Sequence, residues 1–404
     1  MDGKRLLHSL RLENFLSYGP EGVQLELEPL NILIGQNASG KSNLIQAVEL
    51  LRAAPNGLSS FLRQGGGVAE WLYKGGTDLP AAEVAAAVDY PASQDQLRHF
   101  LSFTVNGQQL QIVDEAVNSA TGGKRPEIPT IYYSYGHGEP AVAVRVNAVS
   151  GNEDTATPRW GKQPITGIKP DASILSQRTD PDVYPQFNYL AEQYRAIKVY
   201  RNFNFDRPNS MRRPQQADLP ADFLEEDGRN LSLVLSRLQH QGVMETISEK
   251  LRAVYEDVER ISVNLDGGTV QTYIYERGLS SPIPAARLSD GTLRYLCLLT
   301  ILYHPTPPPL ICLEEPEIGL HPDLISGLAE MLKEASQRTQ IIVTTHSDLL
   351  VSKFSDTLEA VVVCERTPTG TTLKRLEAAA LGTWLEEYSL GEVWMRGGIG
   401  GTRW

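Results

Sequence analysis

Alternation of apolar and polar residues is the first regular pattern along this chain. One polar residue separates Leu10 from Leu12, and the same spacing recurs at Val23, Leu25 and Leu27. A period of two residues is typical of strands that bury one face, so the pattern predicts half-buried antiparallel strands. The next run, residues 30–34, is more continuously apolar, which favours a central strand covered on both faces.

A glycine-containing loop follows that central strand, and a helical pattern follows the loop. The loop, residues 35–42, has the sequence GQNASGKS. Apolar residues then recur at helical spacing, at Leu44, Ile45, Val48 and Leu51. The order strand, glycine loop and helix is the context in which a phosphate-binding loop functions.

The middle of the chain combines strand-like and helical patterns. Residues 84–114 alternate like strands, whereas residues 147–190 are polar and contain prolines, which predicts an irregular insertion. Helical spacing returns at residues 231–238 and 244–254, and both stretches are too short for a long coiled coil.

The last third predicts a hairpin followed by alternating helices and apolar strands. The hairpin covers residues 261–277 and turns at Asp266-Gly267-Gly268. The whole pattern predicts an α/β fold with a mixed central sheet flanked by helices, an antiparallel β subdomain and a small helical insertion. We divide the chain into an N-terminal lobe, an irregular and helical insertion, and a C-terminal lobe, which are residues 1–145, 146–260 and 261–404.

Composition places the chain among ordinary globular proteins. It has 404 residues, of which 41% are hydrophobic, and a net charge of −12. That charge argues against a surface built broadly to coat nucleic acid or an anionic membrane. The longest mostly apolar run, residues 293–303, is far shorter than the ~20 residues of a membrane helix. Residues 1–5 lead directly into a strand pattern, so we expect a cytoplasmic protein without a membrane partner.

The three cysteines, Cys297, Cys312 and Cys364, are isolated and have aliphatic neighbours. Their odd number and wide spacing fit neither a disulfide framework nor a metal knuckle. We expect all three to be buried structural residues.

The residue types of the glycine loop suit the phosphates of a nucleoside triphosphate. Gly35 and Gly40 allow the backbone angles that turn successive amides toward phosphate oxygens, and the next helix adds its positive N-terminus. Lys41 supplies a positive charge to the β and γ phosphates, and Ser42 offers a hydroxyl to Mg²⁺. The expected nucleotide-binding residues are Gly35, Asn37, Ser39, Gly40, Lys41, Ser42 and Asn43.

Two further apolar strands end in polar side chains. Residues 310–313 precede Glu314 and Glu315, and residues 340–343 precede a polar stretch that contains His346. Carboxyl ends of parallel strands meet at the sheet edge where ligands bind. Adjacent strand residues point to opposite faces, so one carboxylate can hold the metal while the other polarises the attacking water. The imidazole can hydrogen-bond a γ-phosphate.

A polar cap precedes the apolar helix that begins near Leu293. The hydroxyls and glycine of Ser289-Asp290-Gly291-Thr292, with the helix N-terminus, form a cap that suits a γ-phosphate. Ser and Asp are also favoured in ordinary helix caps, so a cap without a ligand is the alternative.

Together these motifs resemble the RecF/SMC-like branch of the ABC-type ATPases, and specifically the AAA_21 group of predicted ATPases found near DNA-repair and phage-defence genes. The resemblance covers most of the chain. Its carriers are residues 35–42 (Walker A), 288–292 (signature), 310–315 (Walker B), 317–322 (D-loop) and 344–347 (H-loop). Residues 224–231 and 388–404 also resemble that group.

The resemblance implies a P-loop NTPase with ABC-type head architecture, a hydrolase that uses ATP and Mg²⁺. The implied catalytic residues are Lys41, Glu315 as the base, and His346; the implied metal ligands are Ser42 and Glu314; and Ser289 with Gly291 would cap ATP held by a second subunit. The implied partners are a second copy of the chain, DNA, and a separately encoded effector or nuclease. We expect an ATP-driven switch in DNA repair or phage defence, and the alternative is a nucleotide-gated regulatory subunit of an effector nuclease.

The chain also departs from the family pattern. Glu314 stands where many relatives have aspartate, and Gln64 is only a candidate for the Q-loop glutamine. Tyr18 is either an adenine-stacking residue or an ordinary turn aromatic.

Three related classes fit less well. A transporter signature would read LSGGQ, whereas this chain has Asp290 and Thr292, and long SMC arms would need heptads. A nuclease of the OLD type would need a TOPRIM domain after the ATPase. Asp180-Pro181-Asp182 offers paired aspartates but follows no buried strand, so it predicts a turn.

Residues 194–213 form a basic and aromatic segment, which predicts a docking surface for DNA or a partner. Its cations are Arg195, Lys198, Arg201, Arg207, Arg212 and Arg213, interleaved with Tyr200, Phe203 and Phe205. Such a pattern suits phosphates and stacked bases. The alternative is a structural strand with solvated arginines.

Overall fold

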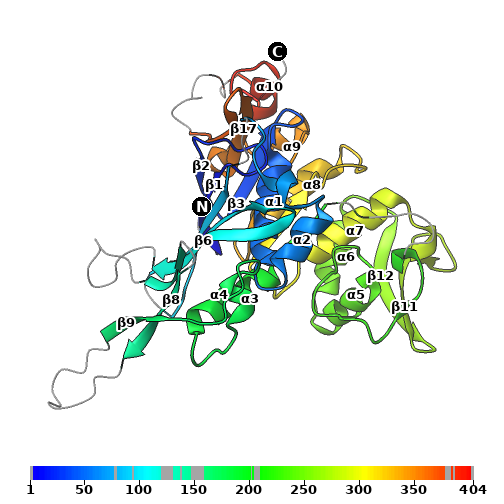
Figure 1. Cartoon of the computed structure of the whole chain (residues 1–404). Helices are drawn as coiled ribbons and strands as arrows, with labels where there is room; N and C mark the ends of the chain where they lie inside the picture. The colour runs from blue at the N-terminus through cyan, green and yellow to red at the C-terminus, as the bar shows by residue number, and fades with distance from the viewer. Residues whose placement is uncertain are drawn as a thin grey trace, which may run out of the picture.

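The computed structural model of the chain describes residues 3–76, 80–92, 95–119, 131–136, 139–146, 159–201, 203, 210–377, 384 and 387–401 (Figure 1). These ranges contain a six-stranded mixed sheet, an eight-stranded antiparallel sheet and a four-stranded sheet. The four-stranded sheet lies with α5 (Leu231–His240) and α6 (Met244–Arg252) in a lobe at the right of Figure 1. The predicted α/β class with a mixed central sheet is confirmed.

The six-stranded sheet carries the loops of the predicted site. Its strands, in spatial order, are β10 (Lys198–Tyr200), β15 (Leu310–Glu314), β16 (Gln340–Thr344), β3 (Leu30–Gly35), β17 (Val361–Thr367) and β18 (Gly370–Arg375). The first five are parallel, and β18 is antiparallel to β17. Strand β3 therefore lies between strands that come much later in the chain.

Successive residues of these strands enter two different hydrophobic cores. Ile32 and Ile34 belong to one core, and Leu33 belongs to the other. Strands β15, β16 and β17 alternate in the same way, which places Cys312 and Cys364 in the second core. A sheet covered on both faces needs such nearly continuous apolar runs. All three cysteines are buried and free, as predicted.

The second core lies between the six-stranded sheet, the eight-stranded sheet and the helices of the first half of the chain. The eight strands, in spatial order, are β2 (Val23–Glu26), β1 (Leu7–Glu13), β4 (Ala82–Val88), β5 (Leu97–Asn106), β6 (Gln109–Ser119), β7 (Ile131–Gly136), β8 (Glu139–Val146) and β9 (Arg159–Pro164). The helices are α1 (Lys41–Ala53), α2 (Leu58–Gln64), α3 (Ile174–Gln177) and α4 (Pro185–Ala196). The antiparallel strands predicted around residues 10–12 and 23–27 are confirmed as β1 and β2, and those predicted over residues 84–114 are confirmed as β4, β5 and β6.

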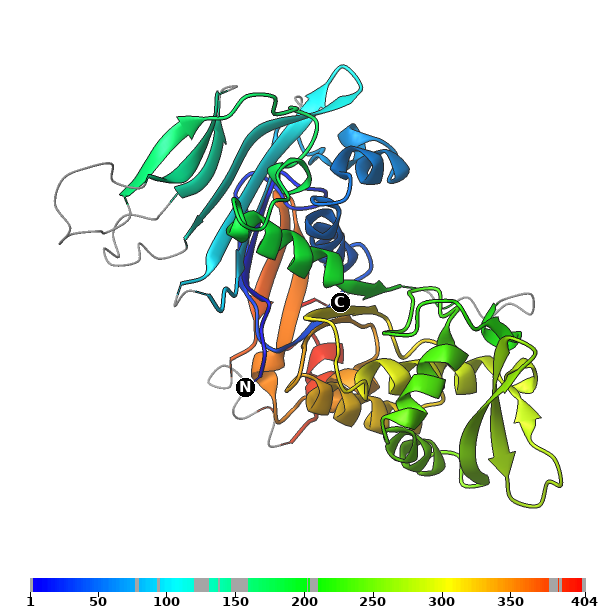
Figure 2. The same ribbon diagram turned by 90° about the horizontal axis from the view of Figure 1, so that it is seen from below.

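The first core lies on the opposite face of the six-stranded sheet, under the later helices (Figure 2). These are α5 (Leu231–His240), α6 (Met244–Arg252), α7 (Asp290–Leu302), α8 (Leu324–Ala335), α9 (Asp348–Ser352) and α10 (Leu390–Met395). The four-stranded sheet contains β11 (Gln215–Gln216), β12 (Val258–Asp266), β13 (Thr269–Glu276) and β14 (Ile283–Pro284). The predicted hairpin and helices of this region are therefore confirmed.

One buried amide joins the two large sheets. The Gln340 side chain at the start of β16 accepts hydrogen bonds from the amides of Leu6 (3.1 Å) and Leu7 (2.9 Å). It also donates to the carbonyls of Leu7 (2.8 Å) and Glu28 (3.1 Å). All four partners would otherwise need other hydrogen bonds in a dry environment, so this side chain fixes β1 against the central sheet.

The prediction of an irregular insertion at residues 147–190 is wrong for residues 159–164, 174–177 and 185–190, which form β9, α3 and the start of α4. Residues 159–164 form β9, which pairs with β8 through the main chain and so needs no apolar alternation. Helix α4 begins at Pro185, and its buried residues Phe187, Leu190, Ala191 and Tyr194 have helical spacing. That spacing was present in the sequence, and the surrounding polar residues obscured it. Residues 147–158 lie outside the described ranges.

No helix within the described ranges is long and apolar enough to cross a bilayer. The division into three segments stays a prediction. The eight-stranded sheet extends from residue 7 to residue 164, and the six-stranded sheet takes strands from both ends of the chain.

Candidate functional site

Three predicted loops meet at one edge of the six-stranded sheet. Strands β15, β16 and β3 are adjacent and parallel, with Glu314 opposite Thr344 and Thr344 opposite Leu33. Their carboxyl ends therefore bring the phosphate loop, the two glutamates and the His346 loop together. Ligands of α/β proteins bind at such an edge.

The phosphate loop has the backbone that its glycines predict. Gly35 and Gly40 have φ values of +149° and +102°, and helix α1 begins directly afterwards at Lys41. A Cβ on Gly35 would lie 2.2 Å from the Cys364 carbonyl oxygen, and one on Gly40 would lie 2.5 Å from Thr371 Oγ1. Neither position accepts a side chain without displacement, so both glycines are required by geometry.

The loop is braced from outside by β18 and by residues of the first turn. Tyr18 donates its hydroxyl to the Gly40 carbonyl (3.0 Å), and Thr371 Oγ1 donates to the Ser39 carbonyl (3.0 Å). Asn43 donates its amide to Ser17 Oγ (2.7 Å). Tyr18 is fully buried, and burial raises its pKa well above the ordinary value. It is therefore a brace of the loop and does not offer a face to adenine.

Lys41 lies inside the curve of the loop. Its Nζ donates to the carbonyls of Gly35 (2.8 Å) and Gln36 (2.7 Å). Burial lowers the pKa of Lys41, while the nearby Glu315 and Glu314 carboxylates act in the opposite direction. Ser39 Oγ is buried nearby without a hydrogen-bond partner. A buried ammonium and an unpartnered hydroxyl fit an anion, and Asn37 and Ser42 lie exposed on the same loop.

Glu314 contacts an arginine that sequence reasoning did not assign to the site. Tyr200 of β10 pairs with Leu313, so the next residue, Arg201, lies beside Glu314. Arg201 Nε is 3.5 Å from Glu314 Oε2, and the same guanidinium pairs with Glu49 on α1. These residues border a cavity of about 210 Å³ that is lined by Arg201, Arg294, Glu314, Glu315 and Ile318. A carboxylate in such a polar cavity can hold a divalent cation.

Glu315 lies beyond the strand, in a left-handed turn with φ of +46°. Its amide donates to the Thr344 carbonyl (2.9 Å), and its Oε1 is 3.5 Å from His346 Nε2. We expected strand alternation to separate the two glutamates; instead, β15 ends at Glu314 and the turn redirects Glu315. Only a specific local constraint holds a non-glycine residue in this conformation, which is common at active sites.

Glu317 joins the loop after β15 to the loop after β16. Its Oε1 accepts hydrogen bonds from the Thr345 hydroxyl and from the His346 amide (3.3 Å). Its Oε2 is buried without a hydrogen-bond partner, and burial raises the pKa of this carboxyl group. The sequence placed Glu317 only at the start of the D-loop, because its partners come from another strand.

The signature loop leads into α7, and its Ser289 and Asp290 are exposed. Ser289 caps the helix by accepting a hydrogen bond from the Thr292 amide (3.1 Å). Gly291 lies against the D-loop, because a Cβ at this position would be 3.0 Å from the Gly319 carbonyl oxygen. Arg212 is 8% exposed, donates to the Leu288 carbonyl (2.6 Å) and pairs with Asp290.

Three cations of the basic segment 194–213 are paired within the fold, which favours the alternative of a structural segment, whereas Arg195 and Arg213 are exposed. Arg201 and Arg212 pair with the site as described above, and Lys198 lies 3.5 Å from Glu225. Tyr200 and Phe203 are buried and stack with ring centroids 5.6 Å apart. Phe205, Asp206 and Arg207 lie outside the described residues.

Two other features were predicted from the sequence: the turn at Asp180-Pro181-Asp182 and the Q-loop candidate Gln64. Asp180 Oδ1 accepts hydrogen bonds from the amides of Asp182 (3.0 Å) and Val183 (3.2 Å), which is the predicted turn. Gln64 is exposed at the end of α2. Its assignment to the Q-loop stays a prediction.

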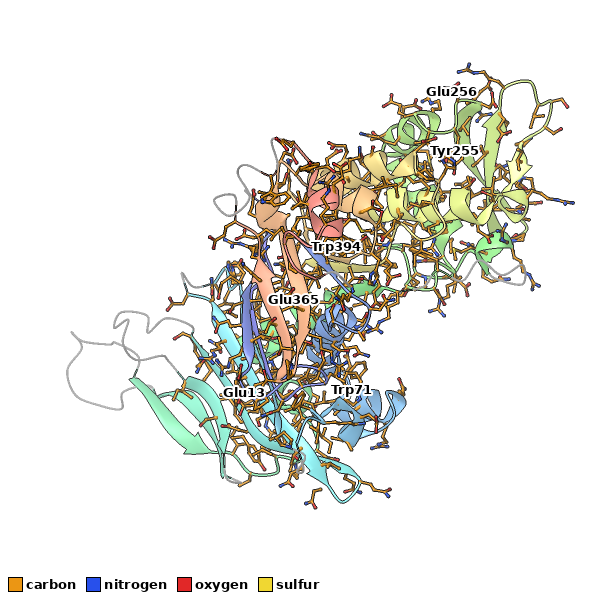
Figure 3. The ribbon with its side chains drawn as sticks, turned by 90° about the horizontal axis from the view of Figure 1, so that it is seen from above. Glu13, Trp71, Tyr255, Glu256, Glu365 and Trp394 are labelled. Carbon is orange, nitrogen blue, oxygen red and sulfur yellow. The ribbon has the colours of Figure 1, made fainter. Side chains whose placement is uncertain are left out.

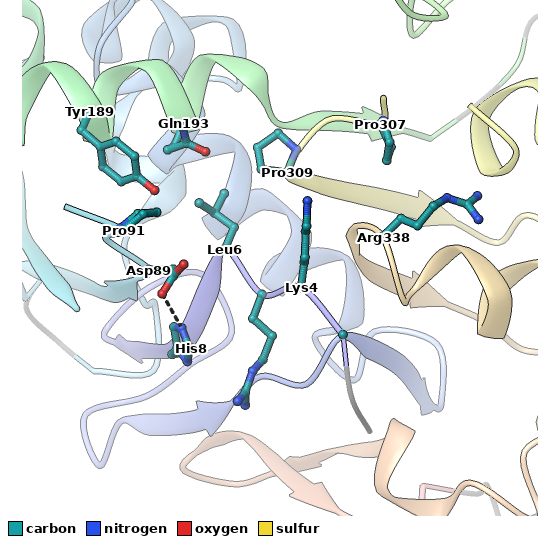
Figure 4. A pocket seen from close by; sticks show the side chains of 12 residues that line it. Lys4, Leu6, His8, Asp89, Pro91, Tyr189, Gln193, Pro307, Pro309 and Arg338 are labelled. Atoms are coloured by element: carbon teal, nitrogen blue, oxygen red, sulfur yellow. Dashed lines mark ion pairs between the residues drawn. The ribbon is translucent and has the colours of Figure 1, made fainter. Parts of the chain in front are cut away.

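A larger cavity of about 630 Å³ lies at the opposite edge, where β15 and β16 begin (Figure 4). Most of its charges are satisfied within the chain. Arg5 lies 3.7 Å from Glu28, His8 lies 3.5 Å from Asp89, and Arg338 donates to the Leu302 carbonyl (2.7 Å). Its lining includes none of the predicted site residues, so this cavity is separate from the phosphate-loop edge.

Comparisons with known proteins agree with this architecture. The family model described as “AAA domain, putative AbiEii toxin, Type IV TA system” matches residues 30–352. Comparison with curated proteins gave no match.

Solved SMC head domains have a similar fold. One is the SmcHead bound to the C-winged helix domain of ScpA, with a TM-score of 0.55, 14% identity, and coverage of 93% of this chain and 99% of that one. Another is the Smc head domain with an extended coiled coil bound to the C-terminal domain of ScpA from Pyrococcus furiosus, with a TM-score of 0.54, 14% identity, and coverage of 95% and 99%. The chain belongs to the AAA_21 family and has the fold of the RecF/SMC-like, ABC-type P-loop ATPases.

Proposed function

We propose that this chain binds and hydrolyses Mg²⁺·ATP and works as an ATP-driven dimerisation switch in DNA repair or phage defence. The observation that carries the proposal is the meeting of Lys41, Glu314, Glu315 and His346 at one sheet edge. A phosphate loop alone would support binding, whereas the added carboxylates and imidazole support hydrolysis.

In this proposal each residue of the edge has one task. The loop amides, Asn37, Ser39 and Asn43 hold the phosphates, and Lys41 exchanges its two carbonyl partners for phosphate oxygens. Ser42 and Glu314 would hold Mg²⁺, which supplies charge neutralisation to the β and γ phosphates. Arg201 would have to release Glu314 for this to happen.

Glu315 is the proposed base. Its carboxylate accepts the proton of a water whose oxygen attacks the γ-phosphorus, while the bond to the bridging oxygen breaks and leaves ADP and inorganic phosphate. His346, 3.5 Å away, orients this carboxylate and reaches the γ-phosphate. Glu317 keeps the His346 loop in register with the base.

The signature loop needs a second chain to act. Ser289 is exposed at the N-terminus of α7, where an anion would be stabilised. Two large apolar side chains are exposed beside the site loops: Ile318 of the D-loop at 52% and Leu349 after His346 at 48%. A two-fold interface that buries these side chains would place Ser289 and Gly291 of one copy over the ATP of the other.

The test compares wild type with Glu315→Gln in Mg²⁺ and ATP. Wild type should turn ATP over and remain largely monomeric at steady state, whereas Glu315→Gln should hold ATP and accumulate as a dimer in analytical ultracentrifugation. The matched control is Glu330→Gln, which changes an exposed helix carboxylate on α8. Equal hydrolysis by wild type and Glu315→Gln would disprove the assignment of the base.

The alternative function, a nucleotide-gated regulatory subunit of a separate effector nuclease, would use the same residues. The proposed DNA partner rests on the family resemblance, because three cations of the basic segment are paired within the fold. Co-purification with tagged Glu315→Gln in ATP distinguishes these functions. An effector retained with ATP and lost without it favours the regulatory subunit, and retained DNA alone favours the autonomous ATPase.

A further inference from the structure

The C-terminal glycine segment, residues 397–401, lies against the phosphate loop although nearly the whole chain separates them. Gly401 is buried, and a Cβ built on it would lie 3.2 Å from Gly35 Cα and 3.0 Å from Val363 Cγ1. The backbones of Gly35 and Gly401 therefore approach each other closely. Gly35 also lies close to Cys364, because a Cβ built on Gly35 would be 2.2 Å from the Cys364 carbonyl oxygen.

Two side chains hold Gly401 in this place. Glu365 of β17 accepts a hydrogen bond from the Gly401 amide (2.7 Å), and Trp394 of α10 donates its indole N–H to the Gly401 carbonyl (3.3 Å). Figure 3 labels both residues, Glu365 on the orange strands and Trp394 beside the red helix. Gly397, Gly400 and Gly401 have positive φ values of +79°, +80° and +69°. This turn therefore suits glycine, and a larger residue would be strained.

The other end of the same element is fixed to the helix that follows His346. Helix α10 packs on α9, and the Leu390 amide donates to Ser355 Oγ (2.9 Å). Ser352 Oγ donates to Ser389 Oγ (3.2 Å), and a Cβ on Gly391 would lie 2.2 Å from the Asp348 carbonyl oxygen. The C-terminal element thus contacts both the start of the phosphate loop and the start of α9.

We propose that the C-terminal glycine segment is a positioning element of the nucleotide site. It sets the position of Gly35 and links the phosphate loop to the His346 loop through α10 and α9. This inference rests on the proposed function, because it assigns the segment to ATP binding at the same site. Gly401 and Glu365 are positioning residues, since they act through Gly35 and need no contact with ATP.

Gly401→Ala tests the proposal, with Gly242→Ala as the matched control. Both glycines have left-handed φ values, +69° and +76°, but a Cβ on Gly242 has nothing within 4 Å. Both variants should lose some thermal stability through the strained φ, and Gly401→Ala should lose more because its Cβ meets Val363 and Gly35. Only Gly401→Ala should displace Gly35 by a few tenths of an ångström and raise KM for ATP about tenfold, with kcat within about twofold of wild type.

Glu365→Ala provides a second variant that adds no atom near Gly35. It frees the Gly401 amide and should raise KM for ATP about threefold, again with little change in kcat. Unchanged KM in both Gly401→Ala and Glu365→Ala, or equal increases in Gly401→Ala and Gly242→Ala, would overturn the inference while leaving the proposed function intact. Failure of the wild-type protein to bind ATP would overturn the proposed function and this inference with it.

Discussion

The phosphate loop and the signature loop are both glycine-containing helix entrances, yet they differ in their surroundings. The phosphate loop is enclosed by Tyr18, Thr371 and the C-terminal glycine segment, and its Lys41 is buried. The signature loop is exposed at Ser289 and is supported on one side by Arg212.

This difference indicates where each loop finds its ligand. An enclosed loop with a buried ammonium can select a phosphate within one chain. At the signature loop, the Ser289 hydroxyl already accepts a hydrogen bond from the Thr292 amide. The positive end of the α7 dipole therefore faces outward, where it can stabilise an anionic ligand bound to another molecule. Four experiments test whether the phosphate loop binds ATP within one chain and whether the signature loop acts on ATP bound to a second chain.

Lys41→Ala should have the largest effect, because it removes the lysine that donates to the Gly35 and Gln36 carbonyls of the phosphate loop. We expect ATP hydrolysis to fall by about 100-fold or more, since a preorganised charge on the transferring phosphate is lost. Steady-state phosphate release measures this. Lys74→Ala, an exposed lysine paired with Glu70, is the control and should retain wild-type turnover. Comparable losses in both variants would indicate a general folding defect.

Mixing Lys41→Ala protein with Ser289→Arg protein tests whether the signature loop acts across an interface. A mixed dimer has one doubly altered site and one intact site, so an equal mixture should recover about a quarter of wild-type hydrolysis when subunits exchange freely. Each variant alone should be nearly inactive. Activity of the mixture equal to the mean of the separate proteins, at every concentration, would show that a site is contained in one chain.

Arg212→Ala should separate the two loops, because it removes contacts of Arg212 with Leu288 and Asp290 on the signature side. It leaves the Leu288 carbonyl and Asp290 without this partner, which should lower the free energy of unfolding by about 1–3 kcal/mol. Hydrolysis should fall about tenfold while ATP affinity stays near wild type. The neighbouring Arg213→Ala, at an exposed position, serves as the control. A large loss of ATP affinity would mean that the loops are not separable.

Tyr18→Phe should have the smallest effect. It removes one hydrogen bond to the Gly40 carbonyl and should lower the free energy of unfolding by about 1 kcal/mol. ATP affinity should change by no more than about threefold, because the ring does not contact the base. Tyr273→Phe removes a less buried hydroxyl contact, to Gln271, and is the comparison. An affinity loss well beyond that limit would restore the adenine-stacking hypothesis for Tyr18.

The parts of the site that the sequence predicted are contiguous in the chain. The phosphate loop, the two glutamates and His346 each follow an apolar strand, so local spacing and the rule for parallel sheet edges were enough to collect them. Arg201, Arg212 and Glu317 were assigned other roles, because their partners belong to distant segments. The turn at Glu315 was also unforeseen, since a left-handed non-glycine residue has no sequence signal of its own.

The central place of β3 has a consequence for synthesis of the protein. β3 pairs with β16 and β17, which follow it by about three hundred residues, whereas β4 to β9 pair largely with their neighbours in the chain. At about 5–20 residues per second, β16 leaves the ribosome on the order of tens of seconds after β3. The antiparallel meander can therefore form early, while the phosphate loop waits for the last quarter of the chain. Ribosome-bound fragments that end before β15 should resist protease in the meander and fail to bind ATP.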